Sequence, residues 1–192
     1  MPVGAIIDSI GTLLGGLLGG LIGSKLSEKF KDELNYIIAA WAMSLGIALI
    51  PKVGILGPVV ISLVLSYIIG FVLDFDGHVN SLVLKVSKKI FGNSSLDIEK
   101  LSVFIVLTAF GGSGIVGSMT EAISGDNSII IARAVCNTIT AIMFAASVGP
   151  IISIASIFGL ISLSLFFYCA KLIMPLMTDM VYANFIATGG IL

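Results

Sequence analysis

Two opposite charges stand inside apolar stretches of this sequence. Asp8 lies about two helical turns into the first stretch, and Arg133 lies at a similar depth in a later one. A charge near the middle of a bilayer costs at least about 3 kcal/mol, so each charge needs a partner. Matched depth and opposite sign predict an ion pair, with either a structural role or a role in charge selection, gating or proton coupling. Two alternatives are that Glu121 partners Arg133 instead and that either side chain reaches the interface.

A run of small residues, Gly111-Gly112-Ser113-Gly114, falls halfway along another apolar stretch. Glycine costs about 1 kcal/mol relative to alanine inside a helix, so the run predicts a break. Backbone groups freed at that depth are tolerated only if they are buried in protein or line a wet cavity. The run therefore indicates a binding site, or alternatively a tight helix crossing. The predicted substrate-binding residues are Gly111, Gly112, Ser113, Gly114, Asn137 and Thr138.

The polar residues Asn137, Thr138 and Thr140 lie near the expected depth of this break, as do Asn184 and Thr188 on the last apolar stretch. They predict a polar cavity. The alternative is interhelical hydrogen bonding, worth about 0.6 kcal/mol per contact.

A glycine zipper is predicted near the N-terminus. Small residues let helix backbones approach closely, which is what brings helices together in lipid. The partner is either another helix of this chain or a second copy, which would make a homo-oligomer. The alternative is a glycine-rich wall of a pathway. The row consists of Gly11, Gly15, Gly19 and Gly23.

Other chemistry is not indicated. We find no nucleophile–base–acid motif, P-loop or dinucleotide fingerprint, so we expect no enzyme and no cofactor. Cys136 and Cys169 are expected to be small packing residues. His78 has no second ligand near it, which argues against a metal site. No Lys/Arg patch suggests nucleic acid as a partner.

The composition indicates a protein that lies in a lipid bilayer. Of the 192 residues, 57% are hydrophobic and only 11% are charged, whereas a soluble domain carries about 25% charged residues. Repeated apolar runs of about 20 residues match the thickness of a bilayer. We predict an all-α polytopic membrane protein with about seven transmembrane helices. The expected spans are Val3–Ser24, Leu34–Ile50, Gly54–Leu73, Leu101–Ile123, Ser128–Val148, Ile151–Ile173 and Leu176–Leu192.

The lysines predict the orientation. Seven lie in the turn Lys25–Glu33 and the polar stretch Asp74–Lys100, and two lie on the alternate side. The positive-inside rule then puts both segments in the cytoplasm and the N-terminus outside. The polar stretch also predicts a short amphipathic helix on the membrane surface, with Val79, Leu82, Val83, Val86 and Ile90 at helical spacing.

Two short matches suggest an internal duplication. Leu21–Ser24 resembles Ile115–Ser118, and Gly57–Val60 resembles Gly149–Ile152, at offsets of 94 and 92 residues. Opposite topology would make the copies inverted, as in many secondary transporters, with the site between repeats near mid-membrane. The alternative is a duplicated packing unit. The predicted organisation is a repeat over 1–75, a cytoplasmic segment over 76–100, a second repeat over 101–174 and a seventh helix over 175–192.

The chain resembles the bacterial YqgA/YdfK-like membrane protein family, domain of unknown function 554. The resemblance covers almost the whole chain and is clearest in the glycine-rich first helix, in Gly117–Gly149 and in Ala187–Leu192. It implies a polytopic inner-membrane protein usually described as a transporter, without a substrate. Members usually continue past the last Gly-Gly pair by about another helix, so we expect a short member or a removed end. Members commonly have Asn at position 8 and Asp-Gly at 137–138, which argues against proton coupling through the fifth helix.

The first functional hypothesis is a transporter or channel for a small solute or ion. In it, Gly111–Gly114 would offer backbone contacts, and Asp8 and Arg133 would set charge selectivity or gate the outer side. The alternative is a non-transporting structural or regulatory membrane protein that assembles through the first helix.

Overall fold

The computed structural model is helical and contains no strand over the residues it describes, which are 1–75, 77–82, 85, 98–173 and 177–191. This confirms the predicted all-α class. The label η marks a 3-10 helix. The elements are α1 (Val3–Ile22), η1 (Gly23–Lys25), α2 (Glu28–Leu49), η2 (Ile50–Lys52), α3 (Leu56–Val72), α5 (Ile98–Phe110), α6 (Gly112–Ser124), α7 (Ser128–Val148), η3 (Pro150–Ile154), α8 (Ala155–Ile173) and α9 (Asp179–Ile191).

Five segments among the described residues are long and apolar enough to cross a membrane, as judged by length and composition. α3 with 17 residues and α9 with 13 are shorter than the roughly 20 that a bilayer needs. The five long apolar segments make the fold that of a helical membrane protein. Seven crossings and the inverted repeat stay predictions. The five segments are Val3–Ile22, Lys29–Lys52, Lys100–Ser124, Ser128–Val148 and Pro150–Ile173.

α2 begins earlier than hydropathy predicts. The segment expected to be a turn, Lys25–Glu33, is helical from Glu28 onward. The Ser27 hydroxyl accepts a hydrogen bond from a first-turn backbone N–H, which is a standard N-cap. Lys29 Nζ lies 3.8 Å from Oε1 of Glu33, which is one helical turn further along α2. These charges lower the hydropathy of the segment, so the predicted span begins after them. A helix can nevertheless include charged residues at an end that is exposed to water.

Two glycines with positive φ end helices close to the predicted ends of the spans. Gly125 ends α6 with φ 74°, and Gly149 ends α7 with φ 96°, both in a region that favours glycine. Pro150 then opens η3. In the turn after α6, the hydroxyl and N–H of Ser128 donate to Asp126 and hold the pKa of that carboxyl below its ordinary value.

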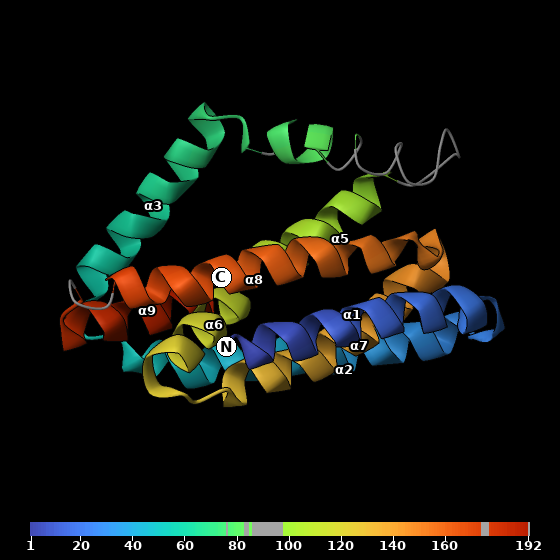
Figure 1. Cartoon of the computed structure of the whole chain (residues 1–192), viewed down its shortest axis with the longest axis horizontal. Coiled ribbons are helices and arrows are strands. Elements are labelled where there is room, and N and C mark those ends of the chain that lie inside the picture. The colour runs from blue at the N-terminus through green and yellow to red at the C-terminus, as the bar shows by residue number, and fades with distance from the viewer. Residues whose placement is uncertain (76, 83–84, 86–97, 174–176, 192) are drawn as a thin grey trace.

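The glycine row of α1 packs along α7, and the two helices lie side by side in Figure 1. A β-carbon added at Gly19 would lie 2.7 Å from the Cα of Ile142, closer than van der Waals contact allows. The residue numbers of the contacting pairs increase together along the two helices, so α1 and α7 are parallel. The partner of the row is therefore a helix of the same chain. The contacting pairs are Gly4 with Ile130, Gly11 with Thr138, Gly15 with Ala141, Gly19 with Ile142 and Gly23 with Ala146.

A second pair of glycines brings α1 against the start of the sixth span. β-Carbons added at Gly16 and Gly20 would lie 2.7 Å from the backbone nitrogen of Ser153 and from the Cβ of Pro150, respectively. Here the residue numbers decrease from Ser153 to Pro150 as they increase from Gly16 to Gly20, so α1 runs antiparallel to the sixth span. The opposite face of α1 is apolar and exposed, as expected for a lipid-facing surface. Its residues include Ile6, Ile10, Leu13, Leu17 and Leu21.

α5 and α6 form one span that is broken at Gly111, which confirms the predicted interruption. α5 ends at Phe110 and α6 begins at Gly112. Gly111 itself has φ −59° and ψ 134°, close to polyproline geometry. The break is confined to one residue, and the rest of the small-residue run starts the new helix.

α3 leans away from the other helices and mainly contacts α9 (Figure 1). The side-chain oxygen of Asn184 accepts hydrogen bonds from the N–H groups of Gly54 and Ile55, at 2.9 and 3.0 Å, and so holds the chain entering α3. α9 begins at Asp179, later than the predicted Leu176, and residue 176 lies outside the described residues.

The predicted surface helix is described only in part. Residues 77–82 are helical and α5 begins at Ile98, three residues before the predicted Leu101. Val83, Val86 and Ile90 lie outside the described residues.

Close packing of α1 on α7 gives the first test. Gly19→Ala should destabilise the protein by about 1–3 kcal/mol, because its methyl group would overlap the backbone of α7. Thermal unfolding in detergent, followed by helical circular dichroism, measures the effect.

Gly70→Ala is the matched control, since it is also a helical glycine but has nothing within 4 Å of an added β-carbon. It should be neutral or stabilise by up to about 1 kcal/mol through helix propensity. Equal behaviour of the two variants would contradict the packing of α1 on α7.

Candidate functional site

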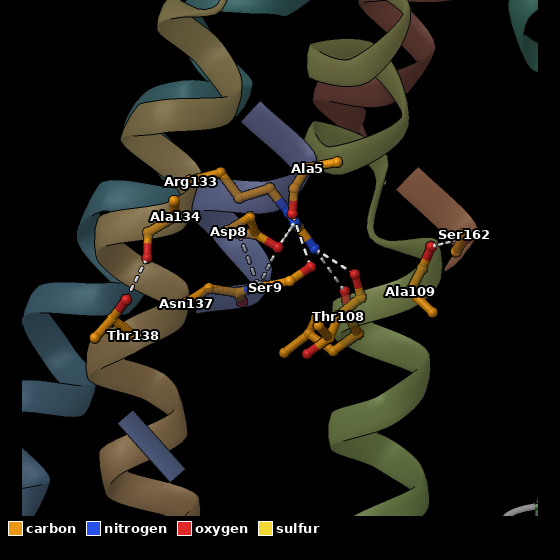
Figure 2. Close-up of polar contacts among 11 residues, drawn as sticks. Ala5, Asp8, Ser9, Thr108, Ala109, Arg133, Ala134, Asn137, Thr138 and Ser162 are labelled. Carbon is orange, nitrogen blue, oxygen red and sulfur yellow. Dashed lines mark hydrogen bonds and ion pairs between the residues drawn. The ribbon is translucent and has the colours of Figure 1, made fainter. Parts of the chain in front are cut away.

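The predicted ion pair between Asp8 and Arg133 is present and buried. Arg133 Nη1 donates to Asp8 Oδ2 at 2.8 Å, and the side chains are 5% and 0% exposed, respectively. Asn137, one turn further along α7, donates from Nδ2 to Asp8 Oδ1 at 3.2 Å. Figure 2 shows the carboxylate of α1 held between these two side chains of α7. The i, i+4 spacing puts both donors on one face of α7.

The same guanidinium reaches the break in the fourth span. Arg133 Nη2 donates to the carbonyl of Thr108 at 2.6 Å and, more weakly, to that of Leu107 at 3.4 Å. The carbonyl of Leu107 also accepts from the N–H of Gly111 at 3.1 Å. The last carbonyls of a helix lack intrahelical partners, so the bond to Thr108 satisfies one carbonyl at the end of α5. Ser162 of α8 donates to the next carbonyl, that of Ala109, at 2.5 Å. Figure 2 shows donors from α7 and α8 converging on this carbonyl end.

The amide end of the break is different. Gly111 is the N-cap residue of α6 and supplies no side-chain cap. The N–H groups of Gly112 and Ser113 lie in the first turn, where no intrahelical acceptor exists. They also lie at the positive end of the helix dipole. The start of α6 therefore offers backbone donors to whatever occupies the space in front of it.

A cavity of about 190 Å³ lies at this amide end. Its polar wall comes from the start of α6 and from α7, and its apolar wall comes from α2. Among the described residues that line it, none carries a carboxylate, and Asp8 is bound by Arg133 and Asn137 outside the lining. The lining residues are Ile38, Trp41, Ala42, Leu45, Gly46, Leu107, Gly111, Gly112, Ser113, Arg133, Cys136, Asn137 and Thr140.

The structure brings most of the predicted site residues together. Gly111, Gly112, Ser113 and Asn137 all line the cavity, as does Arg133.

Two predicted residues lie outside this lining. A β-carbon on Gly114 would lie 2.8 Å from Arg133 Cζ, so Gly114 makes room for the guanidinium. Thr138 donates back to the carbonyl of Ala134 at 2.7 Å and faces Gly11 of α1. Both residues therefore contribute to packing around the ion pair.

Glu121 does not partner Arg133. Its carboxylate accepts hydrogen bonds from the N–H of Gly4 at 3.0 and 3.2 Å. It is buried at the N-terminus of α1, where the helix dipole favours an anion. The alternative pairing of Glu121 with Arg133 is therefore wrong, because the carboxylate is held by the N–H of Gly4.

The polar residues of the last helix form a separate group. Asn184 and Thr188 line a pocket of about 310 Å³ between α3 and α9, away from Asn137. These two residues therefore do not line the cavity beside Asn137, and Asn184 instead makes hydrogen bonds to another segment, as the alternative predicted.

Sequence reasoning missed Trp41 and Ser162. Nothing in the pattern of α2 shows which of its faces turns toward the break. A serine in an apolar span most often bonds to its own helix, so the contact of Ser162 with α5 gave no signal.

The fold and this buried charge cluster define a polytopic helical membrane protein with a broken span. The family model described as "Protein of unknown function (DUF554)" matches residues 3–192, so the chain belongs to this family. It is 34% identical over 198 residues to "Uncharacterized protein YqgA" of Escherichia coli (strain K12), covering 100% of this chain and 84% of that protein. No solved structure matches the chain. The family predicted from the sequence is confirmed.

The ion pair gives the second test. Asp8→Asn and Arg133→Gln should each lower the free energy of unfolding by about 3–5 kcal/mol, because each leaves a buried charge without its partner. The double variant should lose less than the sum of the two. Chemical denaturation in detergent measures all three.

Glu33→Gln is the control, because it breaks an exposed pair with Lys29 and should cost less than about 1 kcal/mol. Additive losses in the double variant would show that the two buried charges do not depend on each other.

Proposed function

We propose that this chain is a membrane transporter or channel for a small solute or ion, with its site at the break between α5 and α6. The cavity of about 190 Å³ in front of the uncapped start of α6 is the observation that carries the proposal. Broken helices whose ends face a cavity near mid-membrane are how many transporters bind substrates and coupling ions. Irregular backbone at such depth also requires burial or a wet cavity.

We further propose that the chain lies in a bacterial inner membrane with its N-terminus outside. The lysine distribution supports this orientation. The parallel packing of α1 with α7 and the antiparallel packing of α1 with the start of α8 agree with alternate crossings. An inverted pair of repeats, 1–75 and 101–174, would place the break at the repeat interface.

Assembly into a non-transporting complex is the alternative. It would need a face of α1 other than the glycine row, because α7 and η3 cover that row within the chain. A scaffold can also be dry at the break, whereas a transporter needs water to reach it. Water access therefore separates the two functions.

The third test uses the native Cys136, which lines the cavity. In a Cys169→Ser background, Cys136 should react with small charged thiol reagents in membranes, tested from both sides. Ser113→Cys in a background lacking both native cysteines should react as well. Labelling at this depth indicates a water-filled pathway, and mass spectrometry of the intact protein measures it.

Two further positions calibrate the labelling. Asp126→Cys, in the exposed turn after α6, should react fully, and Leu17→Cys, on the lipid-facing side of α1, should not react. If Asp126→Cys reacts while both cavity positions resist reagents from either side, the cavity is dry and the assembly function is favoured.

A further inference from the structure

We infer that the cavity binds a small monovalent anion, which is recognised by Arg133 and the amide end of α6 and exchanges with Asp8 as the partner of the guanidinium. This inference rests on the proposed function and names the substrate class of the same site.

The two ends of the broken helix are not equally available. A broken span offers carbonyls, which suit a cation, at one end and amides, which suit an anion, at the other. The carbonyls of Thr108 and Ala109 already accept hydrogen bonds from Arg133 and Ser162. The amides of Gly112 and Ser113 receive no side-chain cap from Gly111, and both residues line the cavity. Two of the last carbonyls of α5 are therefore occupied, whereas the uncapped start of α6 offers hydrogen-bond donors to a ligand.

The side chains around the cavity also favour an anion over a cation. Arg133 brings a permanent positive charge to the wall and is 5% exposed, while no carboxylate occurs among the described lining residues. A cation entering the cavity would meet the guanidinium and the positive end of α6. An anion would meet a planar group whose N–H donors match an oxyanion well.

Asp8 explains how this site can exist without its ligand. A guanidinium buried in a membrane needs a counter-charge, and Asp8 supplies it from α1, outside the cavity lining. Asn137 donates to Asp8 and also lines the cavity, so it lies between the internal carboxylate and the entering ligand. Asp8 stays on α1 when its partner changes, so the anion must enter together with a proton that neutralises the Asp8 carboxylate, which keeps the buried charge balanced.

The dimensions limit the ligand to a small one. The cavity volume of about 190 Å³ is below the range of about 300–1,000 Å³ that is usual for ligand pockets. The opposite wall is formed by Ile38, Trp41 and Leu45, so it favours weakly hydrated anions over strongly hydrated ones. Thiocyanate, nitrate and iodide are small, monovalent and weakly hydrated.

The chain carries its own reporter, because Trp41 is its single tryptophan and lines the cavity. Iodide, caesium and acrylamide quench tryptophan fluorescence as an anion, a cation and a neutral molecule. In proteoliposomes at constant ionic strength, and relative to free N-acetyltryptophanamide, iodide should quench Trp41 about tenfold more effectively than caesium. Thiocyanate should compete with iodide, and the quenching should saturate.

Variants assign this selectivity to the two charges. Asp8→Asn removes the internal competitor and should raise the apparent iodide affinity about tenfold. Thiocyanate should also raise its melting temperature more than that of the wild type, because ligand binding stabilises the folded state. The double variant Asp8→Asn, Arg133→Gln removes both charges without leaving either unpaired, and should quench equally with iodide and caesium. Glu33→Gln should behave as the wild type.

The outcomes separate this inference from the proposed function. If acrylamide and thiol reagents reach the cavity but iodide has no advantage over caesium, the anion inference is overturned and a wet pathway remains. An unchanged iodide affinity in Asp8→Asn would overturn the exchange with Asp8. If neither acrylamide nor thiol reagents enter, the proposed function itself fails.

Discussion

The guanidinium of Arg133 is the group on which the arrangement of three helices depends. It is buried at a depth where an unpaired charge is unstable, so it requires acceptors. Asp8 of α1 and the end of α5 supply them. The end of α5 in turn exists only because the span breaks at Gly111, and a broken helix leaves carbonyls that need donors. The charge and the break thus satisfy each other, and neither would be stable alone.

The glycine row makes this cluster geometrically accessible. A carboxylate on a short aspartate side chain can reach Arg133 only if the backbones of α1 and α7 lie close together. Glycine at every fourth position of α1 removes the side chains that would hold them apart, and the contacts run the length of both helices. Gly114 plays the same part on α6, where a β-carbon would collide with the guanidinium. Small residues therefore stabilise the site indirectly, because they leave the space that the side chain of Arg133 fills.

Depth along a span could be predicted from the sequence, but rotation about its axis could not. Asp8 and Arg133 were paired because they lie at similar depths, and Gly111 was expected to break the span because of its small neighbours. Asn137 and Thr138 were assigned together, yet adjacent residues point about 100° apart on a helix. One lines the cavity and the other faces α1. The same limit hid Trp41, because α2 is apolar on most faces and its hydropathy does not show which face turns inward.

The proposed duplication does not extend to the charged residues. Subtracting the offset of 92–94 from position 133 gives 39–41, which hold Ala39, Ala40 and Trp41, and adding it to position 8 gives 100–102, which contain no acid. The position matching Gly111 falls at 17–19, inside the continuous helix α1. Both halves therefore have glycine near the same place, but only one half breaks there. The difference follows from the donors, since only the second half has an arginine to satisfy the carbonyls that a break exposes. A duplicated scaffold would thus hold a single charged site, built in one half and neutralised by a carboxylate from the other.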